Sequence, residues 1–428
     1  MEIIKYPTIE KAKELLERPA MKNSDIAEKV QQIINSVKTE GDKAIFSFSE
    51  KFDGVSLSEL KVSEKEFEET ENKITAEFKT AVDIARNNIS KFHESQKRYE
   101  KKVETSEEVI CWRETRPIEK VGLYVPGGSS PLFSTLLMLA IPAQIAGCKD
   151  IVVCTPPQKD GKIAPSVLYV AKLLGIKNIF KIGGAQAIAA MAFGTETVPK
   201  VYKIFGPGNQ WVTTAKQIVN SLGIAIDMPA GPSEVLVIAD ESANPEFVAA
   251  DLLSQAEHGP DSQVVLISTS EELIFETDKK ISELRKQLSR NDIIEQSLKQ
   301  SKLLLVNNLQ EAVDISNDYA PEHLILSVQD ADEIAEEITN AGSVFMGNYS
   351  PESVGDYASG TNHTLPTNGF AKAYSGLSLD SFTKQITFQK LSGEGLQNIA
   401  DTVEIMAATE GLDAHKLAVT IRKKENGN

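Results

Sequence analysis

The sequence predicts an α/β protein with two parallel β-sheets in a duplicated, incomplete arrangement, flanked by small N- and C-terminal extensions. Two series of short, apolar, β-branched runs indicate the strands, and helix-compatible segments of about ten residues or more separate them. The first series is VGLYV at 121, DIVVCT at 150, NIFKIGG at 178 and VYKIFG at 201. The second series is EVLVIAD at 234, QVVLIS at 263, KLLLVNN at 302, HLILSV at 323 and GSVFMG at 342.

The segments outside these series are predicted to be helical or turn-rich. Residues 1–110 are expected to be mainly helical, because charged and apolar residues alternate there with helical spacing. After residue 375 the strand pattern stops, and a turn-rich segment leads to a final helix near residues 413–424. This tail is too small to enclose a core alone, so we expect it to pack on something else, such as another subunit.

These patterns divide the chain into four parts. Residues 1–20 form an N-terminal extension, and residues 21–124 plus 233–375 form a first α/β domain. Residues 125–232 form a second, Rossmann-like domain, and residues 376–428 form a C-terminal helical tail. Open parallel sheets bind ligands outside the carboxyl ends of their strands, so we expect the functional loops at those ends, beside a cleft between the sheets.

The composition excludes several classes of protein. The chain has 428 residues, of which 41 % are apolar and 25 % charged, as in ordinary globular proteins. Its formal charge is −16, and the absence of a dense Lys/Arg run argues against nucleic-acid binding. Charges interrupt the first 30 residues, and the longest uncharged stretch, 121–148, contains glycines and prolines, so neither a signal peptide nor a membrane span is expected. Three cysteines, an odd number, indicate a reduced, cytoplasmic setting.

Three glycine turns follow predicted strands, although no G-x-G-x-x-G fingerprint is present. They are Pro126-Gly127-Gly128, Gly183-Gly184-Ala185 and Gly206-Pro207-Gly208-Asn209. Each precedes a helix-compatible segment, where backbone N–H groups can bind phosphates. The alternative is that they are ordinary turns at strand ends.

A first candidate metal-binding pair ends a predicted helix. Asn244 is a suitable N-cap for that helix, and Gly259 and Pro260 end it. Gln255 and His258 are three residues apart and share one face of its last turn. An amide oxygen and an imidazole nitrogen can bind a metal ion; the alternative is a capping histidine beside an exposed glutamine.

Two further candidates lie in the last quarter of the chain. Asp356 and His363 share the glycine-punctuated loop 351–363, which can bring an oxygen and an imidazole ligand together. The alternative is a turn-forming aspartate and a surface histidine. His415 is predicted in the first turn of the last helix, which Asp413 can cap, and it is equally open to a structural role.

The adjacent Glu322 and His323 are candidates for proton transfer. A carboxylate beside an imidazole that titrates near neutral pH suits the removal of a proton from an alcohol. The alternative is a helix start or a solvated charge pair. A cysteine nucleophile is not favoured, because Cys154 lies in a predicted buried strand and Cys148 closes an apolar segment.

From about residue 20 to residue 424 the chain resembles the histidinol dehydrogenase family. The resemblance is carried by long phrases in order, without departure at the positions that matter: VGLYVPGG, GPGNQWV, DMPAGPSEVLVIAD, SQAEHGPDSQ, DYAPEHL, GDYASGTNHTLPT and EGLDAHKLAVTIR. Several separated matches of this length are more specific than any of the spacings above.

The resemblance implies a set of site residues. The ligands of one Zn²⁺ per subunit would be Gln255, His258, Asp356 and His415. In this family the last ligand comes from the partner subunit of a domain-swapped homodimer, so His415 and Glu410 would reach the partner's site. Glu322 and His323 would be the catalytic acid–base residues. The residues lining the substrate site would be Ser233, Gln255, His258, His323, Asp356, His363, Glu410 and His415. The NAD⁺ contacts would be Tyr124, Gln186 and Asn209.

The resemblance also implies the reaction: oxidation of L-histidinol through L-histidinaldehyde to L-histidine with two NAD⁺, the last steps of histidine biosynthesis. His323 would remove the hydroxyl proton, and Glu322 would activate the water that forms the aldehyde hydrate. The rival interpretations are a dehydrogenase of another polar alcohol, a zinc hydrolase that uses metal-bound water, and a catalytically silent homologue. The retained EGLDAH phrase at 410–415 argues against the first.

Overall fold

The structure is a computed structural model that describes residues 1–18, 23–98, 100–127, 131–229 and 231–425. Its contacts separate the chain into two compact units. The first unit combines Met1–Ser95 with Ile118–Phe382, and the second combines Gln96–Pro117 with the chain from Thr383 onward. The first unit contains both parallel sheets.

A six-stranded parallel sheet has the order β1-β11-β10-β9-β12-β13. Its strands are β1 (Glu2–Lys5), β9 (Glu234–Ala239), β10 (Gln263–Ser268), β11 (Lys302–Leu305), β12 (His323–Ser327) and β13 (Ser343–Met346). Side chains alternate across β9: Val235 and Val237 face one core and Leu236 and Ile238 the other. Both faces are therefore covered, which explains the nearly continuous apolar runs.

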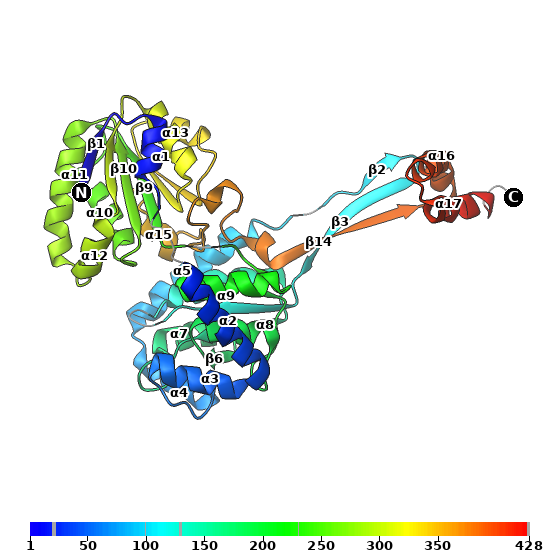
Figure 1. Cartoon of the computed structure of the whole chain (residues 1–428), viewed down its shortest axis with the longest axis horizontal. Coiled ribbons are helices and arrows are strands. Elements are labelled where there is room, and N and C mark those ends of the chain that lie inside the picture. The colour runs from blue at the N-terminus through cyan, green and yellow to red at the C-terminus, as the bar shows by residue number, and fades with distance from the viewer. Residues whose placement is uncertain (19–22, 99, 128–130, 230, 426–428) are drawn as a thin grey trace. The chain divides into compact units, whose positions relative to one another are not determined.

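Helices cover the two faces of this sheet (Figure 1). On one face lie α10 (Pro245–Ala256), α11 (Glu271–Leu284) and α12 (Asn291–Leu298). On the other lie α1 (Ile9–Leu15), α13 (Leu309–Tyr319) and α14 (Ala331–Glu336). Asn244 caps α10 by accepting the N–H of Glu246 at 2.9 Å, as predicted from the sequence.

A five-stranded parallel sheet has the order β6-β5-β4-β7-β8. Its strands are β4 (Lys120–Tyr124), β5 (Asp150–Thr155), β6 (Ile179–Lys181), β7 (Lys203–Phe205) and β8 (Ala225–Ile226). One core around it includes α5 (Ala76–Glu94), α6 (Phe133–Ala146) and α7 (Pro165–Leu173). The other includes α2 (Asn23–Glu40), α3 (Asp42–Phe48), α8 (Gly184–Phe193) and α9 (Gln210–Ser221).

All nine apolar runs singled out in the sequence form strands of these two sheets. The helices of residues 23–94, which the sequence-based boundaries join to residues 233–375, contribute buried side chains to the cores of the five-stranded sheet. The domain boundaries as a whole stay a prediction.

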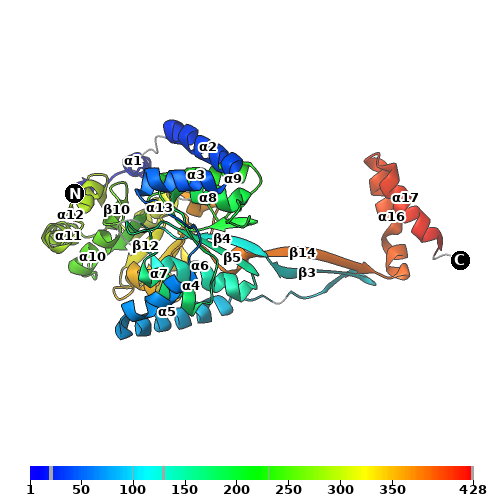
Figure 2. The same cartoon turned by 90° about the horizontal axis from the view of Figure 1, so that it is seen from below.

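The second unit contains an antiparallel sheet and a helical hairpin. The sheet has the order β14-β3-β2, with β2 (Val103–Ser106), β3 (Val109–Pro117) and β14 (Thr383–Leu391). The hairpin consists of α16 (Gly393–Thr409) and α17 (Asp413–Glu425), which lie side by side (Figure 2) and are joined by a hydrogen bond from Gln397 Nε2 to the carbonyl of Lys423 at 2.7 Å.

The prediction that strands end before residue 375 was therefore wrong. Residues Thr383–Leu391 pair with Val109–Pro117 along their whole length. Most of β14 is solvent-exposed, so its sequence, TKQITFQKL, lacks the apolar run that marks a buried strand. The same exposure hides β2, which lies within residues 1–110, the segment predicted to be mainly helical.

No helix among the described residues is both long and apolar enough to cross a membrane.

Candidate active site

The candidate acid–base residues lie where β9 and β12 begin. Glu322 directly precedes β12, His323 is its first residue, and the neighbouring strand β9 begins at Glu234. These are the amino ends of the strands, so the expectation that functional groups gather at the carboxyl ends is wrong for this sheet. Adjacent parallel strands begin at the same edge, which brings these three residues together.

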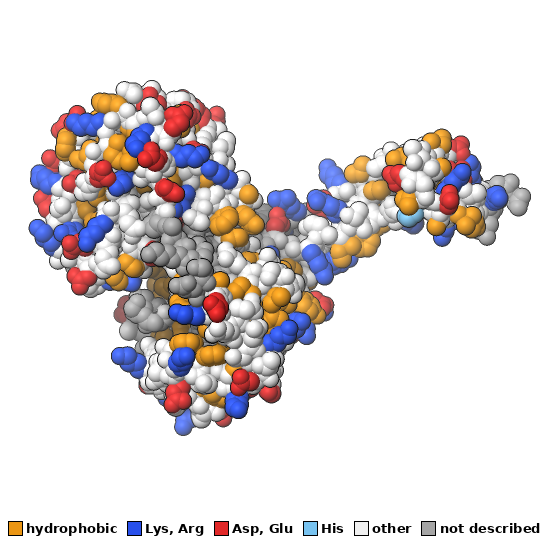
Figure 3. Space-filling model, viewed as in Figure 1, with side chains coloured by type: hydrophobic (Ala, Val, Ile, Leu, Met, Phe, Trp, Pro, Cys, Tyr) orange, Lys and Arg blue, Asp and Glu red, His pale blue; other side chains and the backbone are white. Residues whose placement is uncertain are grey.

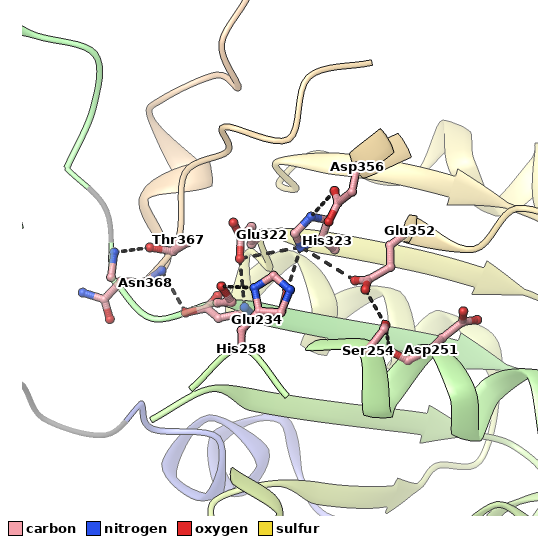
Figure 4. Close-up of polar contacts among 12 residues, drawn as sticks. Glu234, Asp251, Ser254, His258, Glu322, His323, Glu352, Asp356, Thr367 and Asn368 are labelled. Carbon is pink, nitrogen blue, oxygen red and sulfur yellow. Dashed lines mark hydrogen bonds and ion pairs between the residues drawn. The ribbon is translucent and has the colours of Figure 1, made fainter. Parts of the chain in front are cut away.

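The backbone of Glu234 holds both acid–base side chains (Figure 4). Its N–H donates to Glu322 Oε2 at 2.9 Å, and its carbonyl accepts from His323 Nδ1–H at 3.0 Å. Glu322 and His323 are buried, with exposed fractions of 7 % and 2 %. Because the carbonyl requires a hydrogen on Nδ1, Nε2 of neutral His323 keeps its lone pair, and it lies 3.5 Å from Asp356 Oδ1.

The electrostatics of the pair follow from burial and charge. Burial raises the pKa of Glu322 to about 8, although His323 opposes this shift. Burial also disfavours charged His323, but the carboxylates of Glu322, Asp356 and Glu352 outweigh it and raise its pKa to about 10. Glu322 and His323 are therefore a coupled pair, in which burial favours protonated Glu322 and the nearby carboxylates favour protonated His323.

Glu352 is a further buried carboxylate that the sequence did not single out. It begins α15 (Glu352–Tyr357), accepts a hydrogen bond from the Ser254 hydroxyl, and is 1 % exposed. Its Oε2 lies 4.0 Å from His323 Nδ1. A glutamate after a proline is common at helix starts, so nothing in the sequence marked it. The predicted loop 351–363 is thus partly helical.

Gln255 and His258 lie beside this cluster. Gln255 is 0 % exposed, and neither its amide oxygen nor its amide nitrogen has a hydrogen-bond partner among the described residues. The alternative of an exposed glutamine is therefore wrong. His258 Nδ1 lies 3.2 Å from the hydroxyl of Ser233, and the protein around the ring lowers the pKa of His258.

Asp356 connects these groups electrostatically. Burial opposes its negative charge, but the nearby His323, His363 and His258 together lower its pKa. His363 is held in turn: Nδ1 contacts the carbonyl of Asp356 at 3.1 Å, and Nε2 contacts Oγ1 of Thr135 at 3.2 Å. The alternative of a free surface histidine is wrong for His363.

The donor set fits a metal ion by its chemistry. A buried amide without partners costs free energy, and a cation bound by its oxygen would remove part of that cost. An imidazole and a carboxylate, from His258 and Asp356, are the other ligands available nearby. Within the described ranges, no group of three or more His, Cys, Asp or Glu side chains is arranged to hold a metal by itself. A metal ion held by His258 and Asp356 would therefore also need the amide oxygen of Gln255 and one further ligand.

Glu410 and His415 belong to the second unit. Glu410 directly follows α16, and His415 lies in the first turn of α17, as the sequence predicted. Both side chains are exposed.

The three glycine turns meet at the carboxyl edge of the five-stranded sheet, as predicted. Tyr124, at the end of β4, accepts the N–H of Gly184 at 3.1 Å. A Cβ on Gly206, whose φ is +121°, would lie 2.1 Å from the carbonyl oxygen of Tyr124. Gly127 and Gly183 both pack against Pro156, where an added Cβ would lie 2.5 Å and 2.6 Å from its ring. Gly128 lies outside the described residues.

The candidate nucleotide contacts lie in or beside these turns. Asn209 caps α9, and its Oδ1 accepts the N–H groups of Trp211 at 3.1 Å and Val212 at 3.2 Å. This fixes the amide and leaves Nδ2 as the donor for a ligand. Gln186 lies in the first turn of α8, 2 % exposed, and Tyr124 is 5 % exposed. Cys154 is buried, and burial strongly raises the pKa of its thiol, as expected for a structural cysteine.

Comparison with known proteins identifies the family. A family model described as histidinol dehydrogenase matches residues 16–423. The histidinol dehydrogenase of Bacteroides fragilis is 57 % identical over 425 residues, which is 99 % of each chain. That of Vibrio cholerae is 54 % identical over 411 residues, 95 % of this chain and 94 % of the relative.

A solved structure agrees with these sequences. The crystal structure of histidinol dehydrogenase from Elizabethkingia anophelis superposes with a TM-score of 0.98 at 54 % identity, covering 100 % of this chain and 99 % of that one. The similarity therefore spans both units and all the candidate site residues. The chain belongs to the histidinol dehydrogenase family.

Proposed function

We propose that this chain oxidises L-histidinol through L-histidinaldehyde to L-histidine with two NAD⁺, in the cytoplasm, as the last steps of histidine biosynthesis. The observation that carries the assignment of roles is the arrangement of Glu322 and His323 on the backbone of Glu234, beside Asp356 and the unpartnered amide of Gln255. Family membership supports the substrate.

In the first oxidation, His323 is the base in its neutral form, which carries no hydrogen on Nε2. Its Nδ1–H is committed to the carbonyl of Glu234, so Nε2 accepts the hydroxyl proton of the substrate. Bound NAD⁺ supplies the hydride acceptor for the carbinol carbon. In the second stage, Glu322 accepts a proton from the water that adds to the aldehyde carbon, and protonated His323 returns its proton to the carbonyl oxygen. The hydrate then gives a hydroxyl proton to His323 and a hydride to the second NAD⁺.

For the metal, Zn²⁺ at one ion per subunit is the candidate. Gln255, His258 and Asp356 of one subunit and His415 from a second copy of the chain would hold it. When bound, it supplies a Lewis acid that orients the imidazole and amine nitrogens of the substrate. The support from this chain is the unpartnered buried amide of Gln255. Metal analysis should find one zinc per chain, and Gln255→Ala should lower that content.

For substrate and nucleotide, the remaining residues have distinct tasks. Ser233, His363 and Glu410 would contact the polar groups of L-histidinol together with the metal ligands. Tyr124, Gln186 and Asn209 would contact NAD⁺. The support is the fixed amide of Asn209 and the close approach of backbone at Gly206.

The assembly belongs to the same proposal: a domain-swapped homodimer in which Glu410 and His415 reach the partner's site. Apolar side chains are exposed on the second unit (Figure 3), namely Val103, Ile386, Ile405, Met406, Leu412, Leu417 and Ile421. Exposed apolar surface of this extent is typical of an interface. Light scattering after gel filtration should give the mass of a dimer.

One experiment tests the function against its rivals. Purified protein is incubated with L-histidinol and NAD⁺, with and without a chelator, and NADH and L-histidine are measured. Two NADH for each histidinol consumed, lost on chelation, supports the proposal. Turnover without NAD⁺ would indicate the hydrolase, and no turnover the silent homologue. Unchanged histidinol kinetics in Glu410→Gln would indicate a dehydrogenase of another polar alcohol.

A further inference from the structure

Glu234 contacts both candidate acid–base residues through its backbone and not through its side chain. Its N–H holds Glu322 Oε2 at 2.9 Å, and its carbonyl holds His323 Nδ1 at 3.0 Å. Proton transfer requires such groups to be held within about 0.5 Å of the productive geometry. Any displacement of Glu234 along β9 would therefore move both acid–base side chains at once.

The side chain of Glu234 is anchored by an ion pair from the N-terminal segment. Arg18 donates to both carboxylate oxygens, from Nε at 2.5 Å and from Nη2 at 2.8 Å, and the N–H of Asn368 donates to Oε1 at 2.8 Å. Glu234 is 2 % exposed, so its charge depends on these donors. The bidentate geometry fixes the direction as well as the distance.

Arg18 also holds the turn that leads into β12. Its guanidinium lies 3.9 Å from the centroid of the Tyr319 ring, and Nη2 donates to the Tyr319 carbonyl at 2.8 Å. The next residue, Ala320, has a φ of +53°, a left-handed conformation that is strained for a side chain other than glycine. Pro321, Glu322 and His323 follow directly. One guanidinium thus connects the residue before this turn with the first residue of β9.

We propose that Arg18 and Glu234 are a positioning pair for the acid–base residues: Arg18 fixes Glu234, and the backbone of Glu234 presents Glu322 and His323 to the substrate. This inference rests on the proposed roles of those two residues. Stability alone does not explain the pair, because apolar replacement of a buried ion pair is often neutral or stabilising.

The decisive variants change the pair without touching the acid–base residues. Arg18→Lys keeps the charge but cannot form the bidentate contact, and Arg18→Met with Glu234→Gln removes both charges together. For each we expect kcat to fall by about tenfold to a hundredfold, because small misplacements of reacting groups have effects of that size. KM for NAD⁺ and for L-histidinol, and the zinc content, should stay near the wild-type values.

A matched control separates positioning from stability. Lys181, the last residue of β6 in the five-stranded sheet, forms a part-buried ion pair with Glu66, in which Nζ lies 3.4 Å from Oε2. Both residues are far in sequence from the acid–base residues. Lys181→Met should lower Tm but leave kcat per folded protein unchanged. Active-site titration with a tight-binding inhibitor corrects kcat for any unfolded fraction.

The outcomes are distinguishable. Wild-type kcat in folded Arg18→Lys, or equal losses of kcat in Arg18→Lys and in the Lys181→Met control, would overturn the positioning pair while leaving the proposed function intact. A wild-type protein that does not oxidise L-histidinol would overturn the proposed function itself. If the double variant does not fold, Arg18→Lys alone decides the matter.

Discussion

The two parallel sheets place their candidate functional groups at opposite ends of their strands. In the six-stranded sheet, Glu322 and His323 lie at the amino end of β12, beside the amino end of β9. In the five-stranded sheet, the glycine turns follow the carboxyl ends of β4, β6 and β7. Under the proposed function, two sheets of the same kind would therefore serve different chemistry from different edges.

The comparison indicates that the carboxyl and amino ends of parallel strands suit different ligands. At a carboxyl edge, backbone N–H groups of helix starts face outward, which suits a dinucleotide and its phosphates. At the amino edge of β9 and β12, the first residues of the strands offer both an N–H and a carbonyl group. Here these groups orient the carboxyl group of Glu322 and the imidazole of His323.

The largest expected loss of kcat comes from replacing His323 at the amino edge of the six-stranded sheet. His323→Asn can keep a donor to the carbonyl of Glu234 but has no basic nitrogen, so kcat should fall by about a thousandfold. Steady-state kinetics with saturating NAD⁺ measure it. His93→Asn is the matched control, because buried His93 also contacts a carbonyl, that of Ile89 at 2.8 Å. Similar kcat values for the two variants would contradict the role of His323.

A second change at the same edge separates the two oxidations. Glu322→Gln removes the group that we propose activates water, so the second oxidation should slow by about a hundredfold while the first is less affected. The measurement is NADH formed per histidinol consumed in single-turnover experiments, which should fall from two toward one. Equal slowing of both oxidations would show that Glu322 acts through the placement of His323 instead.

At the carboxyl edge, the sensitive position is Gly206. Its φ of +121° and the 2.1 Å approach of an added Cβ to the Tyr124 carbonyl mean that Gly206→Ala must displace the turn. We expect KM for NAD⁺ to rise about tenfold, with KM for L-histidinol unchanged, since the lost binding energy is about 1.4 kcal/mol.

The control for this variant is Gly223→Ala. Gly223 also has a positive φ, +94°, but among the described residues no atom beyond its chain neighbours lies within 4 Å of an added Cβ. The Gly223→Ala variant therefore introduces backbone strain without displacing the candidate nucleotide turns. A rise in KM for L-histidinol in Gly206→Ala would mean that the two edges are not separable.

The smallest expected effect concerns stability beside the amino edge. Burial raises the pKa of Asp251, in α10, to about 7. The folded chain then binds this proton more tightly than the unfolded chain, so the free energy of unfolding falls as the pH rises from about 4 to about 7. Asp251→Asn should raise Tm by a few degrees at about pH 8 and by less at about pH 5. The same change in Tm at both pH values would contradict the shift.

Much of the fold could be predicted from the sequence because short segments carry the patterns that specify strands, helix caps and turns. The nine apolar runs became strands of the two parallel sheets, which also contain β1 and β8, two short strands that the sequence did not indicate. Asn244 caps α10 where its sequence position indicates. The glycine turns also lie where they were expected, after β4, β6 and β7. The exposed strand β14 and the short helix α15 were missed, because neither carries a buried periodic pattern.

What the sequence determined by itself was the α/β class, the strands, and the residue types that can carry the chemistry, because hydrophobic periodicity and side-chain chemistry are properties of short segments. The position of the candidate acid–base pair at the amino edge, and the burial of Glu352 beside His323, follow only from the tertiary structure. The same is true of the contact between Arg18 and Glu234, which are 216 residues apart in the chain. Contacts of that separation depend on strand order and register, which no local pattern specifies.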